Sequence, residues 1–244
     1  MDTTTPIFLY VLSCRIAAHL KRSGEADSAL AALLASTANT AWQTGLCRSL
    51  LADDDFATEV ASRSYWHGNG FLKVVLMDRG FKLRLHLWFP GTACEENIHD
   101  HRWSIASTVI TGELHSETWA DAAQDGDVDV QAQEFRYLAG YCEQPARTVP
   151  LAKTPLRFIG RTRHTTGDSY ALPTSTLHRI CNHGERMVAS LMCSGPAMAG
   201  HTRLIAGQEG LRPKVASQRL SVTELRGQIA RFAALAGLFP ALSA

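Results

Sequence analysis

Two histidines one residue apart stand in the stretch "NIHDHRWSIASTVITGEL" at residues 97–114. On a β-strand, residues two apart share a face, so His99 and His101 can direct both imidazoles at one metal ion. The β-branched run that follows, closed by Gly112, is typical of a strand. The pair alone is weak evidence, because the chain has 10 histidines and histidines on surface turns are common. Two ordinary turn histidines therefore remain an open alternative at this point.

A second stretch, "GDSYALPTSTLHRICN" at residues 167–182, adds another histidine. The two stretches together resemble the paired signature motifs of the cupin superfamily, through His99, His101 and Gly112 in the first and Gly167, Pro173, His178 and Asn182 in the second. The resemblance implies a cupin double-stranded β-helix, or jelly roll, with two metal ligands on one hairpin and a third, His178, on a later strand. The first motif departs from the family pattern at Ala93, where glycine is usual.

The carboxylate ligand usual in cupins, expected three to five residues after the second histidine, is replaced by Ser104, Ile105 and Ala106. The ligand set implied by the resemblance is therefore three neutral imidazoles. In this respect the chain resembles the cysteine dioxygenase (thiol dioxygenase) group, around "IHDH…GEL" and "LHRICN…ERMVASLMCSGP", over roughly residues 64–197. That likeness implies a mononuclear, non-heme Fe(II) dioxygenase or other oxygenase, an oxidoreductase that uses O2 to oxidise a small anionic substrate.

Several positions depart from that group. The cysteine of the thioether cross-link in animal cysteine dioxygenases is Ala106 here, and its tyrosine partner is Ser194. The histidine of a Ser-His-Tyr relay appears as Met192, whereas its serine is kept as Ser190. The resemblance therefore supports the metal site and leaves the identity of the substrate open.

The choice of metal decides the chemistry. Three neutral ligands leave up to three coordination positions of Fe(II) open, and an anionic substrate would complete the site. Zinc or nickel in the same site would instead favour an isomerase, lyase or hydrolase. A non-catalytic, metal-dependent, ligand-sensing cupin is a third alternative. The ligand types do not select the metal, and only the family resemblance favours Fe(II).

The stretch "FKLRLHLWF" at 81–89 alternates strictly, with leucines on one face and Arg84, His86 and Trp88 on the other. If the second face points into the barrel, Arg84 needs an anion to offset its desolvation, which makes it the first candidate for a substrate carboxylate or phosphate. His86 and Trp88 would then line the same pocket. The alternative is that the leucines point inward and Arg84 lies in solvent.

Two weaker candidates for substrate binding lie nearby. Lys73 falls close to the position that the resemblance assigns to the carboxylate-binding arginine of cysteine dioxygenases. Trp103, beside the second histidine, is expected either to wall the pocket or to be an ordinary core or surface aromatic.

The elements that must position these residues form an all-β core between two helical segments. Helical spacing covers residues 4 to about 62, and Asp53 to Asp55 suit the first turn of a short helix. A capping box from Ser221 to Glu224 opens a C-terminal helix. Between them, short strands are expected at 81–89, 105–111, 113–119, 135–139, 156–162, 168–172, 177–181 and 187–193, with an acidic loop at 120–129. The expected organisation is an N-terminal helical segment at 1–66, a cupin barrel at 67–210 and a C-terminal helical segment at 211–244.

Composition excludes some partners. A net charge of +1 without a basic stripe predicts no nucleic-acid partner. The apolar stretch at 6–20 is interrupted by Arg15 and His19, so we interpret it as a buried amphipathic helix and expect no membrane anchor. The 6 cysteines form no CxxC pair, which favours reduced thiols and a cytoplasmic protein. The sequence leaves the oligomeric state open.

Overall fold

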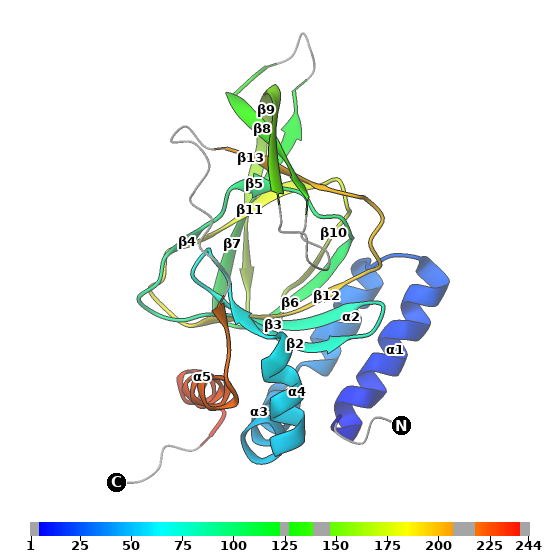
Figure 1. Ribbon diagram of the computed structural model, residues 1–244, viewed down its shortest axis with the longest axis vertical. Helices are drawn as coiled ribbons and strands as arrows, with labels where there is room; N and C mark the ends of the chain where they lie inside the picture. Colours follow the sequence, from blue (N-terminus) through cyan, green and yellow to red (C-terminus); the bar gives the residue numbers. More distant parts are fainter. Residues whose placement is uncertain (1–4, 123–126, 139–146, 207–217, 240–244) are drawn as a thin grey trace.

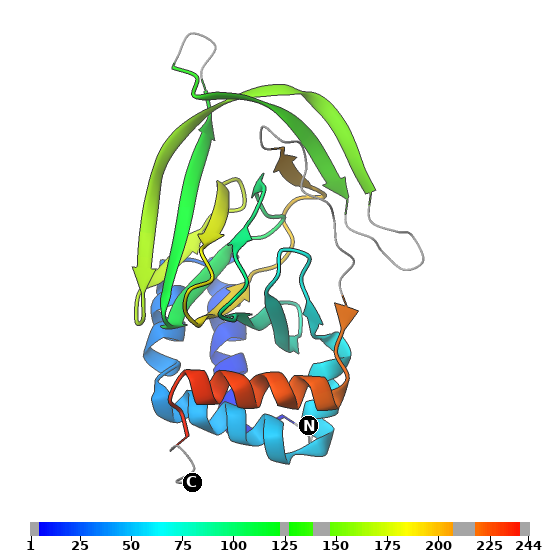
Figure 2. The same cartoon turned by 90° about the vertical axis from the view of Figure 1, so that its left-hand side faces the viewer.

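The computed structural model describes residues 5–122, 127–138, 147–206 and 218–239. Helices gather on one side of a β-sheet structure, and long strands arch over the opposite end (Figure 1; Figure 2). The helices are α1 Ile7–Ser23, α2 Ser28–Thr37, α3 Thr40–Ala52, α4 Asp54–Arg63 and α5 Val222–Leu235. None of these described helices is long and apolar enough to span a membrane.

Side-chain caps define where the helices begin. The Asp27 and Asn39 side chains accept the N–H groups of Leu30 and Trp42 at the starts of α2 and α3. Asp53 caps α4, whose first turn carries the acidic residues expected there. The predicted capping box of α5 is confirmed, because Ser221 and Glu224 each bond the other's backbone N–H.

The strands form two antiparallel sheets. The first has the order β10-β6-β12-β3-β2-β1-β14. Its strands are β1 Tyr65–Trp66, β2 Leu72–Asp78, β3 Lys82–Trp88, β6 Ile105–Thr111, β10 Ser169–Leu172, β12 Val188–Ser194 and β14 Gln218–Arg219. The second has the order β4-β11-β5-β13-β8-β9-β7, and a further pairing of β7 with β11 closes it into a ring. Its strands are β4 Cys94–Glu95, β5 Ile98–His99, β7 Glu113–Asp121, β8 Val130–Leu138, β9 Arg147–Thr165, β11 Leu177–Asn182 and β13 Thr202–Ile205.

The predicted all-β core with helices at both ends is confirmed. The expected strands at 81–89, 105–111, 113–119, 168–172, 177–181 and 187–193 correspond to β3, β6, β7, β10, β11 and β12 within two residues. The acidic loop is shorter than predicted, since β7 continues to Asp121 and residues 123–126 lie outside the described residues. Strands β1, β2, β4, β5, β13 and β14 were not expected. The boundaries of the three proposed segments stay a prediction.

Strand β9 is much longer than the predicted run at 156–162. Its first half, up to Leu156, pairs with β8, and its second half pairs with β7. Pro150 and Pro155 both lie in the first half. Proline lacks a backbone N–H and is tolerated where one strand edge is unpaired. The two prolines explain why the predicted strand begins only at residue 156, although β9 continues through both of them.

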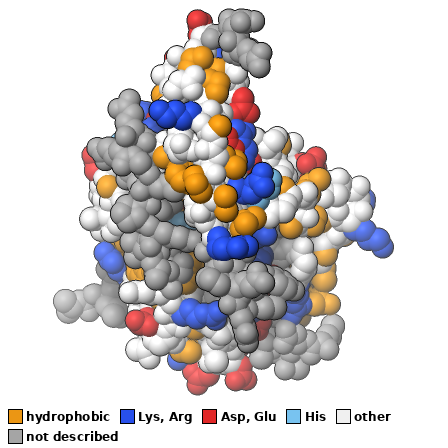
Figure 3. All heavy atoms as spheres, turned by 45° about the horizontal axis from the view of Figure 1, so that its top comes forward, with side chains coloured by type: hydrophobic (Ala, Val, Ile, Leu, Met, Phe, Trp, Pro, Cys, Tyr) orange, Lys and Arg blue, Asp and Glu red, His pale blue; other side chains and the backbone are white. Residues whose placement is uncertain are grey.

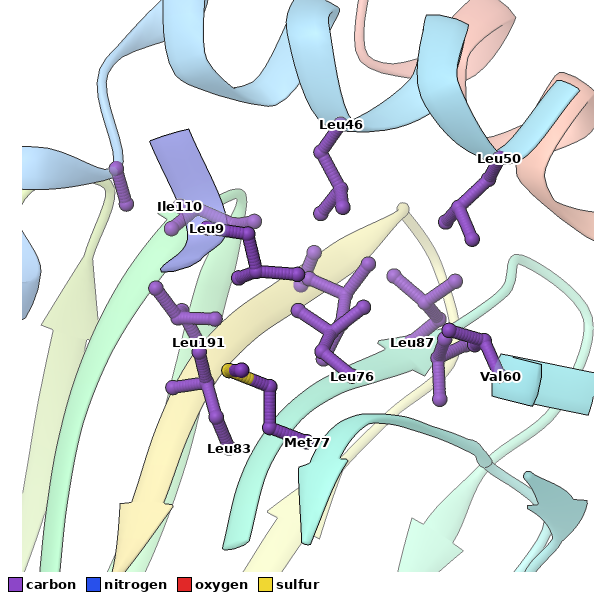
Figure 4. Close-up of a cluster of buried hydrophobic side chains, with 14 of the residues drawn as sticks. Leu9, Leu46, Leu50, Val60, Leu76, Met77, Leu83, Leu87, Ile110 and Leu191 are labelled. Carbon is purple, nitrogen blue, oxygen red and sulfur yellow. The ribbon is translucent and has the colours of Figure 1, made fainter. Parts of the chain in front are cut away.

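The main hydrophobic core lies between the first sheet and the helices. Figure 4 shows side chains from α1, α3 and α4 facing side chains of β2, β3, β6 and β12. Leu83, Leu85 and Leu87 of β3 are fully buried in this core. Burial of each such side chain contributes roughly 1.5–3 kcal/mol. The leucine face of β3 therefore packs against helices and leaves the opposite face for the interior of the barrel.

Gly112 explains the end of the first motif. It lies between β6 in the first sheet and β7 in the second, with a φ of 79°. A Cβ at this position would overlap the carbonyl oxygen of Met187. The chain can change sheets here only with a residue that accepts positive φ and has no side chain.

A buried carboxylate joins three strands of the second sheet. Glu117 of β7 lies directly opposite Arg161 of β9 and Arg179 of β11. One carboxylate oxygen accepts from Arg161 Nη2 at 2.6 Å and the other from Arg179 Nε at 2.6 Å. Burial raises the pKa of Glu117, but the two guanidinium groups outweigh it and hold the pKa below its usual value. Because Arg179 follows His178, this contact also fixes the strand that carries the third candidate ligand.

We predict that Glu117→Gln lowers the free energy of unfolding by about 2 kcal/mol at neutral pH, since a buried charged hydrogen-bond acceptor is lost. The depressed pKa means that this stabilisation is complete above the unfolded-state pKa of about 4.3 and is lost as pH falls through the folded-state value. Urea unfolding of both proteins between neutral and acid pH measures the difference. Glu113→Gln is the matched control on the same strand, since Glu113 is 39% exposed. An equal effect of both substitutions would contradict the prediction.

Candidate metal centre

A cavity of about 470 Å³ lies between the two sheets. Residues of β2, β3, β6, β10 and β12 line it from the first sheet, and residues of β5, β8, β11 and β13 line it from the second. Figure 3 looks at the molecule from the end over which β8 and β9 arch, where Lys and Arg side chains lie among hydrophobic ones. The cavity is the interior of the barrel.

The three predicted histidines meet at this cavity. His99 on β5 and His178 on β11 are direct cross-strand partners. His101 lies just beyond β5, where its backbone N–H donates to the carbonyl of Thr174. One nitrogen from each of the three rings lies within 4.8 Å of the others, and this is a group of the kind that holds a metal ion. Their role as ligands is a prediction that the geometry allows.

The Nε2 atoms of His101 and His178 face one another, and Nε2 is also the nitrogen of His99 that is available to a metal. His99 Nδ1 donates to the carbonyl of Asn97 at 2.8 Å, so the lone pair of this ring is on Nε2. His101 Nε2 and His178 Nε2 lie 2.9 Å apart. His178 Nδ1 is buried and has no hydrogen-bond partner among the described residues. Two ligand nitrogens each about 2.1 Å from one ion and at right angles to one another are about 3.0 Å apart, so this pair fits a shared metal.

The electrostatic environment keeps two of the rings neutral. Burial, then the neighbouring His99 and His178, and then Lys73 and Arg84, hold the pKa of His101 well below its usual value. Burial and His99 do the same for the pKa of His178. Neutral imidazole is the form that binds a metal, so these residues need not lose a proton at neutral pH in order to do so.

A carboxylate approaches the cluster from a position that the sequence did not suggest. Glu96, directly after β4, is buried, and its Oε2 lies 4.0 Å from His99 Nε2. It accepts from Asn69 Nδ2 at 3.1 Å and from the N–H of Ile180 at 3.3 Å. Among the described residues, the candidate metal-binding group contains histidines only. Glu96 adds a negative charge beside it.

The polar face of β3 points into the cavity. Arg84, His86 and Trp88 all line it and are 6%, 8% and 3% exposed. The alternative in which Arg84 lies in solvent is wrong, because the helices cover the leucine face. Arg84 Nη1 donates to Met192 Sδ at 3.8 Å, and its guanidinium lies 5.5 Å from the centre of the Trp103 ring. Burial lowers the pKa of Arg84, and no described carboxylate forms an ion pair with it.

Lys73 and Trp103 also line the cavity. Lys73 Nζ lies 5.2 Å from the centre of the Phe71 ring. Burial, and then the charge of Arg84, lower the pKa of Lys73 to about 8, although Glu96 opposes this. Trp103 stacks against His101 with 6.2 Å between the ring centres. The five predicted substrate-binding residues therefore share one cavity with the three histidines, and their contact with a substrate remains a prediction.

The sequence did not predict several of the residues that line the cavity. Phe71 stacks on Trp88 with 4.9 Å between ring centres, and Tyr170 is half-buried on β10. Phe71 lies in the apolar stretch "FLKVVL" at 71–76, whose Val, Leu and Phe content is typical of a strand. Glu96 had no such signal, because a single carboxylate in a loop is ordinary. Asn182 does not line the cavity, and its Oδ1 instead accepts from the N–H of Gly184.

Comparison with known protein families finds no match, and neither does comparison with curated proteins. Among solved structures, the chain is similar to a double-stranded β-helix protein from Klebsiella pneumoniae, with 15% identity, a TM-score of 0.32, and coverage of 57% of this chain and 85% of that one. A hydroquinone 1,2-dioxygenase from Sphingomonas sp. TTNP3, with 4-hydroxybenzoate bound, has 15% identity, a TM-score of 0.32, and coverage of 51% and 66%. A cupin family protein from Methanocaldococcus jannaschii has 10% identity, a TM-score of 0.31, and coverage of 53% and 84%.

These TM-scores all lie well below 0.5. The two antiparallel sheets, the sheet change at Gly112 and the central cavity define the fold as a cupin double-stranded β-helix with N-terminal helices and a C-terminal helix. The predicted fold class is confirmed.

We predict that His99→Ala, His101→Ala and His178→Ala each lose most bound metal while the protein stays folded, because two remaining nitrogens bind an ion much more weakly than three. Metal analysis after dialysis, with circular dichroism as a check of folding, measures this. His183→Ala is the control, since His183 is exposed and lies outside the cluster. Asn182→Ala should affect metal content less than the three. A variant that keeps full metal content would remove that histidine from the ligand set.

Proposed function

We propose that this protein is a mononuclear non-heme iron oxygenase of the cupin type that uses O2 to oxidise a small anionic molecule. The observation that carries the proposal is that one cavity holds both the three-histidine cluster and the buried guanidinium of Arg84, which no described carboxylate pairs with. A buried cation without an anionic partner is strongly destabilising. A substrate that brings the negative charge would remove this cost and lie beside the histidines.

The metal would be held by His99, His101 and His178. Fe(II) bound by three neutral nitrogens supplies open coordination positions for a substrate and for O2, together with the redox capacity for oxidation. Iron is favoured over zinc or nickel by the resemblance of the motifs to thiol dioxygenases. The ligand geometry alone supports any of these metals.

The side chains around the cluster have separate roles in this proposal. Arg84 binds the anionic group of the substrate, and its planar guanidinium suits bidentate contact with a carboxylate. Phe71, Trp88 and Trp103 surround the substrate and exclude water. His86 lines the cavity, and burial, followed by Lys73 and Arg84, keeps its pKa well below the usual value. Its Nε2 has no partner among the described residues and is available to a polar group of the substrate.

Anaerobic reconstitution with Fe(II), followed by measurement of oxygen uptake, tests the proposal. Small thiols, amino acids and aromatic acids are the compounds to screen, and Zn(II)-loaded protein and the His178→Ala variant are the controls. We expect oxygen uptake that needs both Fe(II) and one class of anionic compound. Zinc or nickel in the purified protein, with no oxygen uptake by the iron form, would favour the isomerase, lyase or hydrolase alternative. Compound binding with no turnover by any metal form would favour a ligand sensor.

We predict that Arg84→Ala keeps its iron and raises the substrate KM by about ten- to a hundredfold, because a charged hydrogen bond worth roughly 1.5–3 kcal/mol is lost. Arg84→Lys should restore part of the affinity, since a point charge does not reproduce the guanidinium fork. Steady-state kinetics with the compound found in the screen measures both. Arg48→Ala, on the exposed surface of α3, is the matched control. Unchanged KM in Arg84→Ala would move the anion-binding role elsewhere.

A further inference from the structure

The cavity holds a second cation besides Arg84. Lys73 of β2 lines the same space, and no described carboxylate forms an ion pair with either residue. Glu96 is the one carboxylate among the described residues that line the cavity. Its oxygens already accept hydrogen bonds from Asn69 and from the backbone of Ile180. The protein therefore leaves two cations of one cavity without a direct anionic partner among its described residues.

Each of the two cations lies over the face of an aromatic ring. Lys73 Nζ lies over Phe71 at 5.2 Å, and the Arg84 guanidinium lies over Trp103 at 5.5 Å. A cation–π contact contributes about 0.5–2 kcal/mol, whereas burial of a charge costs several kcal/mol. The rings hold the two cations in place and do not compensate their desolvation.

The strand register separates the two cations. Lys73 pairs with His86, and Arg84 pairs with Val75, so Lys73 and Arg84 are diagonal neighbours with Cα atoms about 7–8 Å apart. Phe71, which Lys73 covers, precedes it in the chain and lies on the side away from Arg84. Arg84 instead contacts Met192 of β12, on the opposite side of β3 from β2. The two side chains therefore contact different neighbours. After burial, which is the largest cause in each case, Arg84 lowers the pKa of Lys73, and Lys73 and Arg84 both lower the pKa of His86.

An aromatic surface adjoins Lys73 on the side away from Arg84. His86 is the register partner of Lys73, and its ring packs edge-on to Trp88 at 5.8 Å and to Phe71 at 5.3 Å. Phe71 and Trp88 themselves stack at an interplanar angle of 22°. His86 adjoins both cations, because it pairs with Lys73 and lies two residues from Arg84 on the same face of β3, so its ring can contact the apolar body of a ligand that reaches both.

We propose that the ligand of this cavity is a small dicarboxylate, with one carboxylate bound by Arg84, the other by Lys73, and its apolar body against the ring of His86. The inference rests on the proposed function for its assignment of the cavity as a substrate site, and it narrows that substrate from an anion to a diacid. A monoacid would leave one of the two cations without a direct anionic partner.

The test compares diacids with their own monomethyl esters, which have nearly the same size and one charge fewer. Isophthalate and glutarate, each against its monomethyl ester, are titrated calorimetrically into the purified protein under nitrogen. In at least one of these pairs we expect the diacid to bind about tenfold or more tightly than the ester, as loss of one charged contact predicts. Equal binding of diacid and ester in both pairs would overturn the proposal.

Variants identify the groups responsible. In Lys73→Met and in Arg84→Met the preference for the diacid should fall to within about threefold, because each variant removes one of the two charged contacts. Lys21→Met and Arg48→Met, at exposed helix positions, are the matched controls and should keep the preference. Circular dichroism confirms that each variant is folded. A preference that survives in both cavity variants would show that other groups bind the second carboxylate.

The same titration, repeated after the metal has been removed with a chelator, shows whether the second carboxylate is bound by the two side-chain cations or by the metal. We expect the preference for the diacid to remain, whereas its loss would mean that the metal binds the second carboxylate and would overturn the proposal. These measurements involve no turnover. Diacid binding without oxygen uptake would contradict only the oxygenase proposal, and oxygen uptake with a monoacid that binds as well as its diacid would contradict only this inference.

Discussion

The alternation of leucine with Arg84, His86 and Trp88 along β3 fixes which side of the first sheet the helices cover. Leu83, Leu85 and Leu87 are all fully buried against the helices. A slip of the register by one residue would exchange the two faces and place the guanidinium in an apolar core, at a cost of several kcal/mol. Because the leucine face must pack against the helices, the polar face must point the other way, into the cavity. Both faces of β3 are therefore buried.

This arrangement explains how the protein tolerates charges inside a barrel. Lys73 and Arg84 lie on β2 and β3, whose other faces are anchored by the main hydrophobic core. The core stabilises the two strands by several buried leucines, which offsets the cost of cations that lack a partner in the protein. The side chains are held on strands and against rings, so little ordering remains to be done when a ligand binds.

The sequence predicted the histidine pair, the third histidine and the fold. The reason given for the histidine pair, namely that both residues lie on one strand, differs from what the structure shows. Strand β5 spans only Ile98–His99, so His101 lies beyond the strand whose alternation suggested the pair. Nothing local connects His178 to these residues, and only the motif resemblance did so. The face of β3 stayed ambiguous because alternation distinguishes two faces without showing what covers each. Here helices cover one face and the cavity lies on the other.

The charges of the cavity connect metal binding to anion binding. Lys73 and Arg84 lower the pKa of His101, so the positive field that favours neutral imidazole also opposes a dication at the same nitrogens. Glu96 offsets part of this field from 4.0 Å away from His99 Nε2. An anion bound between the two cations and the histidines would reduce the repulsion further, and by linkage it would tighten metal binding by the factor by which the metal tightens anion binding. Three neutral ligands thus make the affinity of the site for its metal depend on what else the cavity holds.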